Sequence, residues 1–150
     1  MSERFSEDEQ ALADANASFY AAFEHKSLAE MGDVWAAASP VSCIHPGWGL
    51  LVGRDAVLES WRQIFESTVS ARCRLRRPRL FVAGDVGWVV LVEELALVHE
   101  PADHVHALVL ATNTFLREGG RFRMVHHQAG PPPEAELSEP TDVPPPHTLH

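Results

Sequence analysis

Two adjacent histidines, His126 and His127, lie in the last β-like run of the sequence, just before Pro131. Successive side chains of a strand point to opposite faces of its sheet. One face then carries Phe122, Met124, His126 and Gln128, and the other carries Arg121, Arg123, Val125 and His127. Because the first set is mostly apolar, we predict that His126 and Gln128 face a pocket, where an imidazole with a pKa near ~6.5 can act as an acid or base. The alternative is a structural histidine that satisfies a hydrogen bond.

A carboxylate and an amide accompany these histidines on strand-like segments. Glu93 directly follows the apolar run W-V-V-L-V. A carboxylate buried there either pairs with a cation or has a raised pKa, which makes Glu93 a candidate general base. Glu94 points the opposite way, and the sequence leaves open which of the two faces inward. Asn113 shares a face with apolar residues of its own strand, where it can orient a ligand carbonyl or bridge two strands.

Other chemistries find less support in the residue spacing. His104 and His106 lie on one side of a strand, but the next acid along the chain is Glu118, so a metal coordination sphere is not expected. Cys43 and Cys73 form no C-x-x-C pair, so neither a thiolate zinc site nor a disulfide framework is predicted. The nucleophile motif G-x-S-x-G does not occur. We therefore expect no metal and no cofactor.

Charge restricts the partners. The 150 residues carry a formal net charge of −9, which argues against nucleic acid because phosphate recognition needs a basic surface. The arginines at 72, 74 and 76 alternate with Cys73 and Leu75, and this spacing is typical of a strand with one solvated arginine face. No nucleic-acid partner is expected.

Hydropathy and the N-terminus bear on location. The longest apolar runs, such as Ala107–Ala111, are far shorter than the roughly 20 residues of a membrane helix. The first ten residues are acidic and contain no apolar segment, unlike a secretory signal. We expect no membrane partner and a cytoplasmic, reduced protein.

The elements that position these residues can be read from periodicity. S-x-x-E capping motifs and apolar residues at three- and four-residue spacing predict helices over 6–24 and 27–35, and a third helix opens at G-R-D, from 53 onward. Strands are predicted over 41–45, 50–52, 72–83, 88–98 and the two arms of a hairpin around Gly119-Gly120. Short connections between the long strands favour antiparallel neighbours, hence an α+β fold with helices on one face of a curved sheet.

Composition changes after Pro131. The segment 132–150 is rich in proline and acidic residues and lacks apolar periodicity, which predicts a disordered or extended tail. The domain is therefore expected to cover 1–131.

The order of elements, the G-R-D-A-V helix start and the closing V-H-H-Q-A-G-P resemble the SnoaL-like branch of the nuclear transport factor 2-like superfamily, over about residues 6–131. Gly130 stands where the family's closing motif typically has serine. The resemblance implies a cone-shaped fold, in which a strongly bent, mostly antiparallel sheet wraps around about three helices. It also implies that His45 and Trp48 lie at the cone mouth, and that Tyr20 and Trp35 cover the pocket or pack in the core.

Two functions follow from that resemblance. One is a small-molecule-binding protein, either a simple binder or a cofactor-independent isomerase or cyclase, in which His126 or Glu93 transfers a proton on a small apolar carbonyl compound. The other is a non-catalytic homodimeric module that associates through its sheet face, with the cone filled by side chains. The catalytic aspartates of ketosteroid isomerases and epoxide hydrolases have no counterparts here, and the superfamily hosts both enzymes and non-enzymes.

Overall fold

The computed structural model describes residues 5–99 and 103–133. Its helices are α1 (Glu7–His25), α2 (Leu28–Val34) and α3 (Arg54–Ser67). Its strands are β1 (Ser42–Ile44), β2 (Leu51–Val52), β3 (Thr68–Ala83), β4 (Val86–His99), β5 (Asp103–Glu118) and β6 (Arg121–Gly130). The predicted α+β class is confirmed. Most of the predicted tail, from 134 onward, lies outside the described residues.

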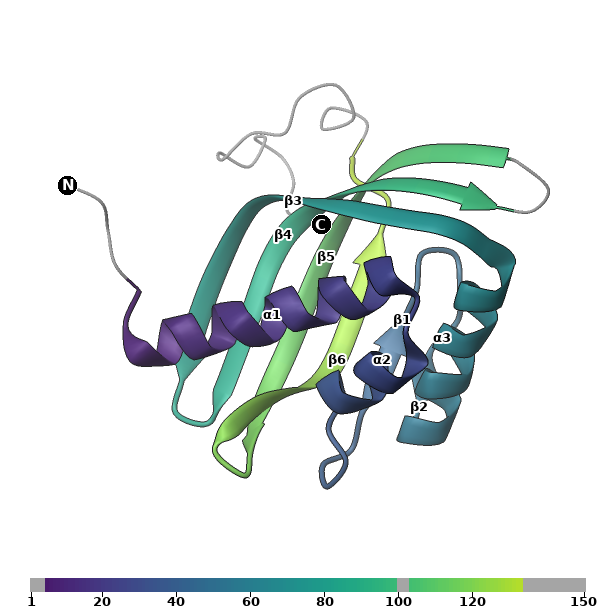
Figure 1. The fold of residues 1–150 in the computed structure, drawn as a ribbon. Coiled ribbons are helices and arrows are strands. Elements are labelled where there is room, and N and C mark those ends of the chain that lie inside the picture. The colour runs from purple at the N-terminus through teal and green to yellow at the C-terminus, as the bar shows by residue number, and fades with distance from the viewer. Residues whose placement is uncertain (1–4, 100–102, 134–150) are drawn as a thin grey trace.

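The strands form one sheet in the order β2-β1-β6-β5-β4-β3. The long strands β3 to β6 are antiparallel neighbours, as predicted, whereas the short strand β1 pairs in parallel with β6. Figure 1 shows α1 lying across one face of the long strands, with α2 and α3 beside the β1–β2 edge. The opposite face carries no helix among the described residues. We call the α1 side the inner face and the uncovered side the outer face.

The helix α1 forms where the capping motif predicts it. Ser6 accepts a hydrogen bond from the Glu9 backbone N–H, and the Glu9 carboxylate accepts one from the Ser6 N–H. The helix ends at Lys26, which adopts a left-handed conformation with φ 51°. Between these ends, one stripe of α1 is buried against the sheet and includes Leu12 and Phe19. This stripe also brings Asn16 and Tyr20 to the inner face.

The start of α3 is tied to the end of α2 by one side chain. The Arg54 guanidinium donates hydrogen bonds to the backbone carbonyls of Gly32, Trp35 and Ala36. These carbonyls would otherwise lack partners at the helix end. These hydrogen bonds fix the start of α3 next to α2, and the apolar side of α3, which includes Trp61, is buried.

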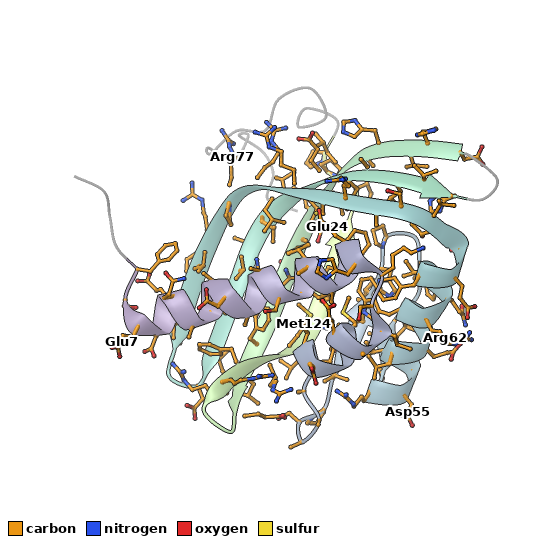
Figure 2. The ribbon with its side chains drawn as sticks, viewed as in Figure 1. Glu7, Glu24, Asp55, Arg62, Arg77 and Met124 are labelled. Carbon is orange, nitrogen blue, oxygen red and sulfur yellow. The ribbon has the colours of Figure 1, made fainter. Side chains whose placement is uncertain are left out.

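Three register shifts interrupt the long strands within the described residues, the first between Thr68 and Ser70 at the start of β3. In β3 the register shifts between Arg76 and Arg79, and Arg77 has a positive φ of 54°. Figure 2 shows Arg77 pointing away from α1. In β6, Thr114 pairs with His126 while Phe115 pairs with Met124, so that residue 125 has no opposite partner. A bulge of this kind changes which side chains face each side of a strand.

The outer face of β3 agrees with the arginine spacing. The side chains at 72 and 74 are exposed, so the predicted solvated face is confirmed there. Arg76 is half-buried and forms an ion pair with Glu94 at 3.4 Å. No helix in the described ranges is long and apolar enough to cross a membrane.

Candidate active site

A cavity of about 400 Å³ lies between α1, α3 and the inner face of the sheet. Its lining is mostly apolar and aromatic. The residues are Phe19, Tyr20, Phe23, His45, Pro46, Trp48, Trp61, Ile64, Ser67, Thr68, Glu93, Leu95, Leu97, His99, Val105, Ala107, Val109 and His127. An apolar cavity of this size with a few converging polar groups is typical of a small-molecule site.

Glu93 is the acidic group of this cavity. Its side chain is 4% exposed, and its Oε2 accepts a hydrogen bond from the Tyr20 hydroxyl at 2.5 Å. Burial raises the pKa of Glu93 to about 7, although the hydrogen bond from Tyr20 opposes the shift. Desolvation disfavours the charged carboxylate, which explains the direction. The question left open by the sequence is settled in favour of Glu93, because Glu94 lies on the outer face beside Arg76 and His106.

Asn113 does not line the cavity, but its side chain hydrogen-bonds to residues that do. It is fully buried on β5, and its amide nitrogen donates to the Asn16 side-chain oxygen and to the Tyr20 hydroxyl, both at 2.9 Å. Its oxygen lies 2.6 Å from Nδ1 of His127. Every hydrogen-bonding atom of the Asn113 amide group is therefore engaged at least once.

The donor and acceptor roles in these hydrogen bonds can be assigned in order along the network. An amide oxygen only accepts, so Nδ1 of His127 carries a proton and donates to Asn113. Asn113 donates to Tyr20, and Tyr20 donates to Glu93. Burial, followed by the nearby charge of Glu93, raises the pKa of Tyr20 well above its usual value, so the phenol keeps its proton. We call these four side chains the Glu93 network.

His127 is uncharged in this network. It is buried, and burial lowers its pKa to about 3, with the neighbouring histidines adding to the shift. Because Nδ1 holds the single proton of the neutral ring, Nε2 is a hydrogen-bond acceptor. The ring also contacts Phe19, with ring centroids 4.9 Å apart.

His45 has the opposite tautomer. Its Nε2 lies 2.8 Å from the Ser60 hydroxyl, and that hydroxyl donates its only proton to the Val57 carbonyl at 2.6 Å. Ser60 can then only accept, so Nε2 of His45 carries the proton. Burial lowers the pKa of His45 to about 4. Two neutral histidines thus lie in the same aromatic surroundings, with ring centroids 6.2 Å apart.

Two polar atoms of the cavity keep a free hydrogen-bonding position. Within the described residues, the buried side-chain atoms that lack a partner are Trp35 Nε1, Trp61 Nε1 and Arg123 Nε. Glu93 Oε1 and His127 Nε2 have no partner in the described part of the chain and are not among those buried atoms, so both remain accessible in the cavity. His45 Nδ1, by contrast, lies 3.8 Å from the Cys43 Sγ.

Several predicted site residues do meet here. Glu93, Tyr20, His45 and Trp48 line the cavity, and Asn113 lies directly behind its wall. Trp48 is 39% exposed and makes an edge contact with His45, which places it toward the mouth. The roles of these residues remain predictions, and only their positions are established.

The predicted position of His126 is wrong. His126 is half-buried on the outer side of β6, where its Nδ1 lies 2.7 Å from the Ser42 hydroxyl. Strict alternation put it beside Met124 on the inner face, but the bulge at Val125 inverts the order from that point on. His127 therefore takes the inward position.

Gln128 and Trp35 also lie outside the cavity. The same bulge turns Gln128 outward, where it is exposed. Trp35 is fully buried at the C-terminal end of α2 and forms a β-bridge with Met124, so it occupies a core position. Neither residue is retained as a ligand contact.

Three polar residues of the site were missed: His127, Asn16 and Ser60. Asn16 carried a detectable signal, because it lies four residues after Leu12 and three before Phe19, on the apolar stripe of α1. Ser60 likewise lies three residues after Val57 on the buried side of α3. Polar residues inside an apolar helical stripe are candidates for buried hydrogen bonds.

Metal ligation finds little geometric support in the part of the chain that the structure describes. No three histidine, cysteine, aspartate or glutamate side chains cluster there in a way that could hold a metal ion. His104 and His106 are exposed on β5, and His106 lies 3.5 Å from Glu94.

A bent sheet with helices on one face and an apolar cavity between them defines an α+β fold of the nuclear transport factor 2-like class. Residues 12–134 match the model of the SnoaL-like domain, and the chain belongs to this family.

Two solved structures of similar proteins cover most of the chain. A proposed dehydratase of the NTF2-like family from Streptomyces avermitilis is 31% identical, with a TM-score of 0.79, over 84% of this chain and 96% of that one. A proposed calcium/calmodulin-dependent protein kinase type II association domain from Thiobacillus denitrificans is 34% identical, with a TM-score of 0.69, over 81% of this chain and 94% of that one.

The F-box protein SKIP8 of Arabidopsis thaliana is 27% identical over 120 residues. The match covers 80% of this chain but only 49% of SKIP8, so the chain spans about half the length of this curated relative.

Proposed function

We propose that this chain binds a small, mostly apolar carbonyl compound in the cavity and that Glu93 takes a proton from the ligand and returns it at another position. No cofactor is needed for such a transfer. The observation that carries the proposal is a buried carboxyl group that titrates near neutrality, with one oxygen fixed by Tyr20 and the other open to the cavity.

The pKa of Glu93 fits this task. A group that titrates near the working pH is present in both protonation states, so it can accept a proton and also give it back. An ordinary exposed glutamate, with a pKa near ~4.3, is a weaker base by more than two units. Once Glu93 has taken the proton, Oε1 can donate it to the negative charge that develops on the ligand.

The similar proteins include a proposed enzyme and a proposed association domain. The Streptomyces avermitilis protein is a proposed dehydratase. Loss of water from a carbon chain also removes a proton, which is a task for a general base. Perturbed pKa values in a cleft favour a functional site over a purely structural one.

The proposal can be tested with α-tetralone, a two-ring apolar ketone with exchangeable protons beside its carbonyl. In D₂O, NMR would follow loss of the signal at that carbon. We expect the wild-type protein to accelerate exchange over buffer and Glu93→Gln to lose about 10²–10⁴-fold of that acceleration, because the general base is removed. Glu94→Gln is the matched control and should retain the wild-type rate. Equal rates for wild type and Glu93→Gln would contradict the proton-transfer role.

A second candidate is a homodimeric association module, favoured by the outer face of the sheet. Phe81 on β3 and Trp88 on β4 stack there with ring centroids 5.3 Å apart, and Phe81 is 43% exposed. Val90 and Leu110 continue this apolar strip on the same side of the sheet. A second copy seated on the strip would remove it from water. The Thiobacillus denitrificans relative is a proposed association domain.

Sedimentation equilibrium tests the dimer. Trp88→Lys should shift the protein to a monomer, because it places a charge in the middle of the strip. Glu93→Gln should leave the dimer intact. A wild-type protein that is monomeric at high micromolar concentration would contradict this second candidate. The two candidates are compatible, since one uses the inner face and the other the outer face.

A further inference from the structure

The Trp61 indole N–H has no partner among the described residues, but its nitrogen is sealed from solvent and so does not open onto the cavity. Five other buried polar side chains that line the cavity have already used their donors. These residues are Tyr20, His45, Thr68, Glu93 and His127. The protons of Tyr20, His45 and His127 go to protein acceptors, as the directions of the hydrogen bonds require. The Thr68 hydroxyl donates to the Ile64 carbonyl at 2.6 Å. With Glu93 ionised, no proton on these five side chains is left for a ligand.

Acceptors, by contrast, remain available. Glu93 Oε1 and His127 Nε2 each have a free lone pair and stay accessible in the cavity. A ligand that brings only acceptors would leave both atoms unpaired as it displaced water, and buried polar atoms without partners are costly.

We infer that the ligand of this cavity carries a hydroxyl group, as an alcohol, phenol or enol, which donates to Glu93 Oε1 or His127 Nε2. This inference rests on the proposed function, whose ligand class it narrows from apolar carbonyl compounds to those that also carry a hydroxyl group.

A protonated amine also carries donors, but it fits less well. A primary ammonium brings a full positive charge into a mostly apolar and aromatic cavity, so its desolvation costs more than that of a neutral hydroxyl group. His127 is held neutral among aromatic rings, and an uncharged donor suits such an acceptor. The hydroxyl group matches the supply of lone pairs without adding a full charge to the cavity.

Binding of matched two-ring probes tests the inference without any turnover. The probes are 2-naphthol, which can donate, and 2-acetylnaphthalene, which can only accept. Isothermal titration at pH 8.5 keeps Glu93 ionised. We expect 2-naphthol to bind about tenfold more tightly, in line with one hydrogen bond to a charged or buried acceptor.

Glu93→Gln should abolish or reverse this preference. The Tyr20 hydroxyl needs an acceptor, since its other side-chain partner, Asn113, already donates to it. Tyr20 will therefore hold the oxygen of the new amide, and the amide NH₂ will face the cavity as a donor. The affinity ratio of the two probes should move by at least about tenfold toward 2-acetylnaphthalene.

His127→Phe provides a second variant, in case the amide substitution disturbs folding. Removing Nε2 should reduce the advantage of 2-naphthol several-fold while the naphthalene ring still binds. His126→Phe, on the outer face, is the matched control and should keep the wild-type ratio.

The outcomes separate the inference from the proposed function. Equal binding of both probes by the wild-type protein would overturn the hydroxyl inference but leave cavity binding in place. Tighter binding of a cationic probe, 2-(aminomethyl)naphthalene, would overturn it in favour of an amine ligand. Binding of none of the probes would contradict the cavity-binding proposal itself, and the deuterium exchange experiment would then be expected to fail as well.

Discussion

Glu93 and Glu94 are neighbours on β4, and His126 and His127 are neighbours on β6, yet each pair is divided between the two faces of the sheet. The inner members are buried and belong to one hydrogen-bond network behind an apolar cavity. The outer members contact an arginine and a serine in partly solvated positions. Residue type alone therefore does not set the chemistry of these groups.

Desolvation accounts for the difference between the two glutamates. The inner carboxyl group is buried in a mostly apolar cavity, so desolvation raises its pKa to about 7. The outer carboxyl group has Arg76 at 3.4 Å. The inner face is thus suited to proton transfer and ligand recognition, and the outer face to solvent or a protein partner. The predictions below test this division by substituting matched pairs of residues.

The largest expected effect is the loss of Asn113, which joins the members of the Glu93 network. Asn113→Ala leaves the Asn16 oxygen and the His127 Nδ1–H without partners and weakens the support of Tyr20. We expect the free energy of unfolding to fall by about 3–5 kcal/mol, because each buried unsatisfied group costs about 1–3 kcal/mol. Urea denaturation would measure the loss.

Thr114, the next residue of β5, is the outer-face control. Thr114→Ala removes a half-buried hydroxyl near Trp88 and should cost less than about 1 kcal/mol. Similar losses for both substitutions would show that the network contributes no more than an ordinary strand position.

The next effect concerns pH. The folded pKa of Glu93, about 7, lies above the ordinary value of 4.5. The folded protein therefore holds a proton that the unfolded chain releases, and the stabilisation present below pH 4.5 is lost as pH rises through 7. A shift of this size corresponds to about 3 kcal/mol.

Comparison with Glu93→Gln isolates that contribution. His45 and His127 act in the opposite direction, since their lowered pKa values make the protein gain stability as pH rises toward 6.5. Those contributions, and the nearby groups Tyr20 and Cys73, are shared by both proteins and largely cancel in the difference. Relative to the variant, the wild-type protein should lose about 3 kcal/mol between pH 4.5 and pH 8.

Much of the fold could be predicted because its signals are local. The capping box at Ser6, the apolar stripe of α1 and the Gly119-Gly120 turn each depend on residues close together in the sequence. Both turn glycines have positive φ, as a tight hairpin requires. The parallel pairing of β1 with β6 has no such local signal. These two strands are far apart in the sequence, and tertiary packing determines that they pair.

The site was predicted only in part, and the reason is the bulge in β6. Alternation assigns faces correctly as long as the register is regular, which holds for Asn113. For Glu93 and Glu94 it places the two carboxyl groups on opposite faces but does not say which is the inner one. One extra residue at Val125 inverts every later assignment, so His126 and Gln128 were placed on the wrong face. No turn residue or glycine marks this bulge in the sequence.

A smaller effect separates two glycines on strands of the same sheet. A Cβ at Gly87, on the inner face of β4, would lie 2.9 Å from a Leu12 methyl carbon and 3.2 Å from the Phe122 ring. Gly87→Ala should therefore push α1 away from the sheet and cost about 1–3 kcal/mol. Thermal unfolding followed by circular dichroism would measure this loss as a lowered Tm.

Gly130→Ala is the opposite case. A Cβ there meets no atom within 4 Å, and the residue has no positive φ. The substitution should be neutral or stabilise the protein by up to about 1 kcal/mol, because alanine restricts the unfolded chain. A Tm that falls equally in both variants would contradict the close packing of α1 over β4.

The least perturbing test changes no residue and reads the protons of the inner face directly. Nitrogen-15 NMR distinguishes a ring nitrogen that carries a proton from one that does not. We expect His127 to be protonated at Nδ1 and His45 at Nε2, because Asn113 Oδ1 and the Ser60 hydroxyl can only accept from them. Both rings should remain neutral on acidification to about pH 5, since burial holds their pKa values at about 3 and about 4. If His127 were instead protonated at Nε2, the direction of the whole Glu93 network would be reversed. The cavity would then offer a donor where the hydroxyl inference requires an acceptor.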